Sequence, residues 1–163
     1  MRPPEESVGA AEITEWTDRA GRSFPRLQAR GKTFTEAFQV AARGFFELFT
    51  DVTQVRPTDE VVIFCESSDS DWLFSDCINT LIYEVRERKM LFSEFRIEVE
   101  GINIKGTIRG EAIDPTRHVL RREKIAGAAF DALFAEEREA GVFVSAVLND
   151  EARHPLFLRE IWG

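Results

Sequence analysis

Apolar side chains recur at alternating steps of four and three residues between positions 33 and 48. The members of this stripe are Phe34, Phe38, Ala41, Phe45 and Leu48. Thr33 and Glu36 stand three residues apart at its start, the spacing of an N-terminal capping box. The pattern predicts an amphipathic helix whose aromatic face packs into the core.

A second helical pattern runs through "DWLFSDCINTLIYEV" and ends in "RERKM", with Phe74, Ile78, Leu81 and Val85 on one face. The preceding cluster of Ser68, Asp69, Ser70 and Asp71 could be compared with a calcium loop. It lacks the central glycine and the terminal glutamate of an EF-hand. We therefore interpret these residues as N-caps and as favourable charges at the start of the helix.

Alternating or β-branched segments predict the strands. The first is a short strand around Leu27–Arg30, which follows an irregular entry, and the second is "VVIFCE". "LFSEFRIEVEG" and "INIKGTIRGE" form a hairpin about Glu100–Gly101, and "EKIAGAAFDALF" and "VFVSAVLND" are two more strands joined by the loop "AEEREAG".

These elements predict an α+β fold in which two helices pack on one face of a mixed, mostly antiparallel sheet. The expected order along the chain is β-α-β-α-β-β-β-β. Residues 1–12 are predicted to be a flexible arm, residues 13–150 a single domain, and residues 151–163 a tail or short helix.

Composition and charge narrow the function classes. The 163 residues carry a formal net charge of −8, which disfavours direct binding to nucleic-acid phosphates and favours a basic protein surface or a hard cation. No apolar stretch approaches the ~20 residues of a membrane span, and the N-terminus lacks a signal-peptide pattern, so a soluble cytoplasmic protein is expected. Dinucleotide, P-loop and zinc motifs are absent from the sequence.

The segment "GEAIDPTRHVL", residues 110–120, contains Glu111, Asp114, Arg117 and His118, and His118 is one of only two histidines in the chain. Asp114 and Pro115 open an ordinary turn, which is one reading. In the other, Arg117 binds an anion and His118 carries a proton or serves as a ligand. A small hydrolase using Asp114, Arg117 and His118 is a further hypothesis, although the sequence places no nucleophile beside them.

Four segments together resemble the archease family in order and spacing. They are "GKTFTEAFQVAARGFFELFTDVTQVRP", "DWLFSDCINTLIYEVRERKMLFSEFRIEVEG", "GEAIDPTRHVL" and "FVSAVLND". The resemblance implies an α+β fold and a non-enzymatic role. It implies a protein cofactor that promotes guanylylation and multiple turnover of an RtcB-type RNA ligase in tRNA splicing or RNA repair. It also implies a carboxylate cluster that binds Ca²⁺ or Mg²⁺ beside a basic residue.

The resemblance assigns site residues individually. Asp150 matches the terminal acidic metal ligand, while Asp51, Asp114, Arg117 and His118 match family signature positions that would contact the partner.

The family's first-strand motif, Asp/Glu-His-Thr-Ala-Asp, is missing from "GRSFPRLQARG". With an insertion, "TEWTD" replaces it and makes Glu15 and Asp18 metal ligands, with Trp16 in place of the histidine. A later Thr-Tyr-His motif is here Ala129, Phe130 and Asp131. The metal site is thus either rebuilt from Glu15, Asp18 and Asp150 or lost. If it is lost, the chain is a divergent interaction or chaperone-like module without the ligase role.

Overall fold

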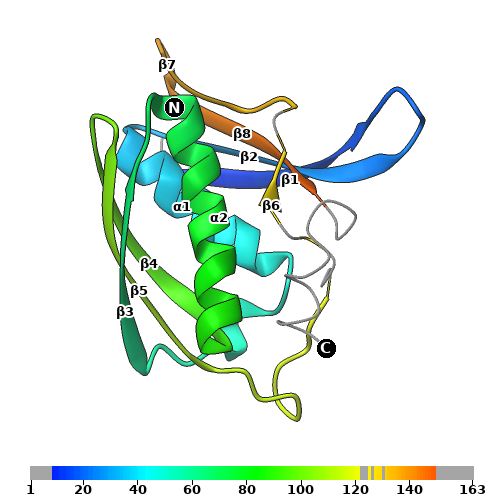
Figure 1. Ribbon diagram of the computed structural model, residues 1–163, viewed down its shortest axis with the longest axis vertical. Coiled ribbons are helices and arrows are strands. Elements are labelled where there is room, and N and C mark those ends of the chain that lie inside the picture. Colours follow the sequence, from blue (N-terminus) through cyan, green and yellow to red (C-terminus); the bar gives the residue numbers. More distant parts are fainter. Residues whose placement is uncertain (1–8, 122–124, 126, 130, 150–163) are drawn as a thin grey trace, which may run out of the picture.

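The computed structural model describes residues 9–121, 125, 127–129 and 131–149 (Figure 1). Two helices, α1 (Phe34–Glu47) and α2 (Ser70–Arg88), are accompanied by a short 3₁₀ helix, η2 (Val52–Gln54). The strands are β1 (Ala10–Thr17), β2 (Ser23–Gly31), β3 (Asp59–Glu66), β4 (Met90–Glu100), β5 (Asn103–Ala112), β6 (Gly127–Ala128), β7 (Phe134–Arg138) and β8 (Gly141–Asn149).

The strands divide into two sheets. One has the order β1-β2-β8-β6, with β7 also paired to β8, and the other has the order β3-β5-β4. Helix α1 contacts β2 and β4, and α2 contacts β3 and β7, so each helix packs against both sheets. The α+β class with two helices is confirmed, whereas the prediction of one sheet is wrong. Periodicity shows which face of a strand is buried but does not show which strand lies beside it.

An N-terminal hairpin replaces the irregular entry predicted before Leu27. Strand β1 pairs antiparallel with β2 from Ala10 opposite Arg30 to Thr17 opposite Ser23, and this hairpin extends away from the helices (Figure 1). The prediction that the flexible arm reaches residue 12 is therefore wrong for residues 10–12. Strand β1 was missed because it is an exposed edge strand and lacks clear alternation of buried and exposed side chains.

The final strands also differ from the prediction. Within the predicted strand "EKIAGAAFDALF", the described residues form only the two-residue strand β6 and the first residue of β7. Most of the predicted loop "AEEREAG" belongs to β7 and pairs with β8. Its charged side chains Glu136, Glu137 and Arg138 are exposed. Charged residues are tolerated on an exposed strand, but they remove the apolar alternation by which a strand is recognised in a sequence. The predicted tail, residues 151–163, lies outside the described residues.

Both predicted helices are confirmed, together with their caps. The Thr33 hydroxyl accepts a hydrogen bond from the Glu36 N–H at 3.1 Å, and the Asp69 carboxylate accepts one from the Trp72 N–H at 2.9 Å. The capping interpretation of the acidic cluster is thus confirmed for Asp69. Lys89 ends α2 in the left-handed conformation, with φ 54°.

Phenylalanine rings are the largest side chains of a core in which aliphatic residues are more numerous. Phe38, Phe45, Phe46, Phe74 and Phe92 are fully buried. Edge-to-face contacts join Phe38 to Phe74 and Phe46 to Phe92, with ring centroids 5.2 and 5.8 Å apart. The described helices include none that is both long enough and apolar enough to cross a lipid bilayer.

Candidate functional site

The loop after β5 begins with a turn built around Asp114. Its carboxylate accepts hydrogen bonds from the Thr116 N–H at 3.0 Å and the Thr116 hydroxyl at 2.7 Å. Its backbone carbonyl accepts hydrogen bonds from the N–H groups of Arg117 and His118 at 3.0 and 2.7 Å. The two bonds from Thr116 to the carboxylate lower the pKa of Asp114, and the bond from the Thr116 hydroxyl contributes most. The turn reading of "DPTRH" is confirmed.

His118 points into the protein, and its side chain is 0% exposed. Its Nδ1 accepts a hydrogen bond from the Asp114 N–H at 2.9 Å, and its Nε2 lies 3.0 Å from Oε2 of Glu111. Because Nδ1 must accept, the geometry fits a neutral imidazole that carries its proton on Nε2 and donates it to Glu111. Both ring nitrogens are therefore occupied, and the expectation that the loop displays His118 to a partner is wrong.

Glu111, at the end of β5, connects this loop to a neighbouring segment. Its Oε1 lies 2.6 Å from Nη2 of Arg117, and its Oε2 accepts a hydrogen bond from the Arg56 N–H at 2.7 Å. The hydrogen bond from Arg117 is the main reason why the pKa of Glu111 falls to about 2. Sequence reasoning gave Glu111 no role, since a carboxylate seven residues before a histidine is not a recognisable motif.

Arg117 and Arg121 fix the loop to residues 47–56. Arg117 donates from Nη1 to the Gln54 carbonyl at 2.7 Å, and Arg121 donates from its backbone N–H to the Phe49 carbonyl at 2.7 Å. Asp51 caps η2, where its carboxylate accepts hydrogen bonds from the Thr53 N–H at 3.0 Å and hydroxyl at 2.6 Å. The side chains of Arg117 and Asp114 remain 27% and 45% exposed. The structure therefore gathers the four signature residues into one region with a buried histidine and a partly exposed polar rim.

The predicted metal ligands do not form a cation site among the described residues. Glu15 is exposed on β1, and Asp18 closes the β1–β2 turn. The Asp18 carboxylate accepts hydrogen bonds from the N–H groups of Ala20 and Arg22, both at 2.9 Å, and pairs with Nε of Arg22 at 3.1 Å. Asp150 lies outside the described residues.

The described part of the chain contains no group of three His, Cys, Asp or Glu side chains that could hold a metal ion. A hard cation prefers several oxygen ligands, and Asp18 already uses both carboxylate oxygens within its own turn. The described residues alone therefore do not supply the ligand set of the expected Ca²⁺ or Mg²⁺ site, whose third predicted member, Asp150, lies outside them.

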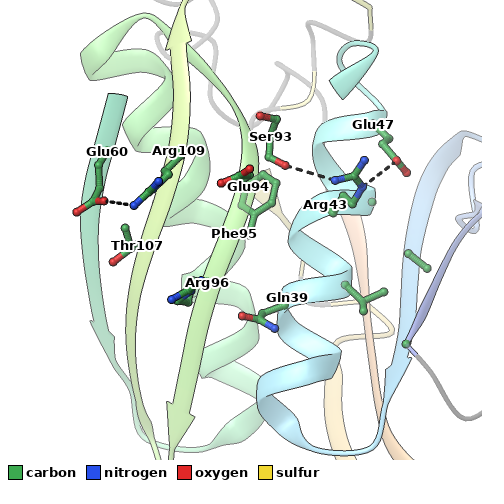
Figure 2. A pocket seen from close by; sticks show the side chains of 14 residues that line it. Gln39, Arg43, Glu47, Glu60, Ser93, Glu94, Phe95, Arg96, Thr107 and Arg109 are labelled. Carbon is green, nitrogen blue, oxygen red and sulfur yellow. Dashed lines mark hydrogen bonds and ion pairs between the residues drawn. The ribbon is translucent and has the colours of Figure 1, made fainter. Parts of the chain in front are cut away.

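A cleft of about 900 Å³ lies between α1 and the outer face of the β3-β5-β4 sheet (Figure 2). The Arg43 guanidinium pairs with the Glu47 carboxylate, one turn further along α1, at 3.5 Å. It also donates a hydrogen bond to the Ser93 carbonyl of β4 at 3.4 Å. Across the sheet, Arg109 pairs with Glu60 at 2.9 Å. None of the predicted site residues that the structure describes lines this cleft.

Comparisons with known proteins agree with this architecture. A model of the Archease protein family (MTH1598/TM1083) matches residues 25–149. The protein archease of Methanopyrus kandleri is 33% identical over 114 residues, which cover 68% of this chain and 80% of that protein. The protein archease of Aeropyrum pernix is 35% identical over 98 residues, or 57% of this chain and 68% of that protein.

A solved structure supports the fold independently. The solution structure of Methanobacterium thermoautotrophicum protein 1598 superposes with a TM-score of 0.72 at 22% identity, covering 86% of this chain and 98% of that one. At this identity the likeness concerns the fold, while the family model extends over most of the sequence. On these grounds, this chain belongs to the archease family.

Proposed function

We propose that the chain is an accessory protein, not an enzyme, that promotes guanylylation and multiple turnover of an RtcB-type RNA ligase. Its proposed setting is tRNA splicing or RNA repair in the cytoplasm. The observation that carries the proposal is the family match over residues 25–149, which includes both helices and the loop after β5.

The chemistry of the loop supports a role in recognition. Both His118 nitrogens are occupied by groups of the chain itself, and the Glu111 carboxylate is bound by Arg117 and by the Arg56 backbone. Neither residue is available as a general base toward a substrate without breaking these bonds. This arrangement disfavours the hydrolase hypothesis based on Asp114, Arg117 and His118.

Charge supports the kind of partner proposed. A chain with a net charge of −8 is attracted to a basic surface, and an enzyme that binds RNA phosphates must present one. The partly exposed rim formed by Asp51, Asp114 and Arg117 would meet the ligase, with the half-buried Glu111 and the buried His118 fixing the loop beneath it.

A second candidate is a divergent interaction or chaperone-like module that has lost metal binding and the ligase role. The observation that favours it is the Asp18 carboxylate, which the β1–β2 turn and Arg22 already occupy. A Ca²⁺ or Mg²⁺ site would require Asp18 to release Arg22 and to join Glu15 and Asp150.

The deciding experiment adds the purified chain in substoichiometric amounts to the RNA ligase of the same organism. We expect faster guanylylation and several ligation cycles per ligase molecule, measured with RNA in excess over ligase. An unrelated acidic protein of similar size serves as the control. Unchanged guanylylation and turnover would reject the ligase role and favour the second candidate.

Calorimetric titration with Ca²⁺ and with Mg²⁺ tests the metal separately. If the site is rebuilt, wild-type protein binds one cation, and Asp150→Ala and Asp18→Asn abolish the heat of binding, whereas Glu137→Gln on exposed β7 leaves it unchanged. No binding heat in wild-type protein would show that the site is lost.

A further inference from the structure

The two edges of the β3-β5-β4 sheet differ in how their backbone groups are covered. At the β4 edge, the Ile97 N–H donates to the Gln39 side chain at 2.8 Å, and the Val99 N–H donates to the Thr35 hydroxyl at 2.9 Å. Both acceptors come from α1, which runs alongside this edge (Figure 2). Helix side chains thus satisfy β4 groups that would otherwise be free to pair with another strand.

Among the described residues, no strand pairs with the outer edge of β3. The strand is eight residues long, and its pairing with β5 is continuous from Asp59 opposite Gly110 to Glu66 opposite Asn103. It contains no proline, no lysine and no register shift, which are three of the features with which proteins commonly protect an exposed edge, and its charged residues, Asp59, Glu60 and Glu66, stand only near its two ends.

Along β3, alternate residues form their backbone hydrogen bonds with β5, and the residues between them direct their backbone groups to the open edge. The Ser67 N–H donates to the Ile102 carbonyl opposite it at 3.1 Å. In an antiparallel ladder such pairs alternate, so Val61, Ile63 and Cys65 bond to β5. The N–H and C=O groups of Val62 and Phe64 therefore point away from β5, toward the open edge.

The side chains of the same two residues are unusually exposed. Val62 is 63% exposed and Phe64 65% exposed, on the outer face of the sheet. Glu66 and Glu60 flank them on that face, where Glu60 also pairs with Arg109 of β5 at 2.9 Å and remains half exposed; Figure 2 shows this face in part with Glu60, Thr107 and Arg109. An edge strand that combines free backbone groups with exposed apolar side chains suits strand addition by another chain.

We propose that β3 docks an extended segment of a partner protein, in which two apolar residues are flanked by basic residues. Such a segment would place its apolar side chains beside Val62 and Phe64 and its cations beside Glu60 and Glu66. This inference is independent of the ligase role, since it depends only on the chemistry of the β3 edge.

Charge distinguishes this partner from a second copy of the chain. Strand β3 carries Asp59, Glu60 and Glu66 and no basic residue. The antiparallel register that pairs all four outward-facing residues is centred on Ile63, and it would bring Val62 opposite Phe64 but also Glu60 opposite Glu66. Like charges directly opposite each other destabilise a strand pair, so a basic segment is favoured over self-association.

The test uses a blocked peptide of sequence KTVTVTK and its acidic counterpart ETVTVTE, added to ¹⁵N-labelled full-length protein. We expect saturable shifts of the amide resonances of residues 61–66 with the basic peptide only, and slower hydrogen exchange at Val62 and Phe64. Val62→Lys should weaken binding of the basic peptide about tenfold, because it replaces an apolar contact with charge repulsion.

Val119→Lys is the matched control, since Val119 is 68% exposed in a loop away from β3 and should leave the affinity unchanged. Amide spectra of both variants verify that they are folded. Absence of shifts at β3 in wild-type protein, or equal binding of both peptides, would overturn the proposal. Self-association without peptide that Val62→Lys abolishes, measured by sedimentation, would show that a second copy is the occupant.

Discussion

The Glu111 side chain connects three parts of the loop region. Its carboxylate bonds to Arg117, to His118 and to the Arg56 backbone, and so joins the end of β5 to the turn at Asp114 and to the segment after η2. Its side chain is only 12% exposed, so these partners replace much of the water that a glutamate normally binds. The positions of Arg117 and His118 therefore depend on the ionised form of Glu111.

Glu111→Gln tests this dependence through pH. The folded-state pKa of Glu111 is about 2 against an ordinary value of 4.5, so its stabilising contribution is complete above pH 4.5 and is lost as pH falls toward 2. We expect the variant to lose about 2 kcal/mol of unfolding free energy near pH 7, the scale of hydrogen bonds to a charged group. Urea unfolding at several pH values measures this loss.

The difference between wild type and Glu111→Gln should shrink steadily below pH 4.5. Glu98→Gln, an exposed change on β4, serves as control and should match wild type across the range. A constant difference between Glu111→Gln and wild type down to pH 2 would contradict the assigned role of the charge.

At the scale of elements, α1 does more than fill the core with phenylalanine. Its N-terminal half supplies Thr35 and Gln39, whose side chains complete the hydrogen bonding of the β4 edge. Its C-terminal end receives Arg121, which donates to the Glu47 carbonyl at 3.1 Å. Helix α1 therefore covers the β4 edge of the sheet with its N-terminal half and binds the loop after β5 at its C-terminal end.

Gln39→Leu tests how much the hydrogen bond between Gln39 and the β4 edge contributes to stability. The substitution leaves the Ile97 N–H without its acceptor, and an unmet donor of this kind costs about 1–2 kcal/mol. We expect that loss in chemical unfolding, together with faster hydrogen exchange at Ile97.

The matched control is Gln54→Leu, since Gln54 is exposed and contributes its backbone carbonyl rather than its side chain to the contact with Arg117. If both variants lost the same stability and Ile97 exchange stayed slow, the edge contact would have no energetic role.

At the scale of the whole molecule, β4 and β5 approach each other closely just before the loop after β5 begins. Gly110 pairs with Phe92 beside the β-bulge, and a Cβ at position 110 would overlap the Leu91 carbonyl oxygen. At Gly106, on the same strand, an added Cβ would lie 3.1 Å from the Arg96 carbonyl oxygen, a tight contact that requires a shift of only a few tenths of an ångström.

Gly110→Ala should therefore destabilise the protein by about 3 kcal/mol, at the upper end of overpacking effects, and Gly106→Ala by only about 1 kcal/mol. Thermal unfolding by calorimetry gives the two values. Equal melting temperatures for the two variants would show that the strands can separate at Gly110 without cost.

Sequence predicted some parts of the site and missed others for identifiable reasons. The Asp114 turn was predictable because an Asx turn depends on residues two positions apart. The burial of His118 was not, because it depends on Glu111 across the turn and on segment 47–56 packed beside it. The metal-binding roles predicted for Glu15, Asp18 and Asp150 came from a family resemblance, and the hydrogen bonds of Asp18 are visible only in the folded turn.

The sequence by itself determined the α+β class, both helices with their caps and the β4–β5 hairpin. These features depend on periodicity and on contacts between near neighbours, which a linear pattern records directly. Only the tertiary structure decided that the strands form two sheets, that β1 joins the first of them, and that α1 covers the β4 edge while no described strand pairs with the β3 edge. Those outcomes depend on which distant segments pair and pack together, and side-chain periodicity carries no record of the partner.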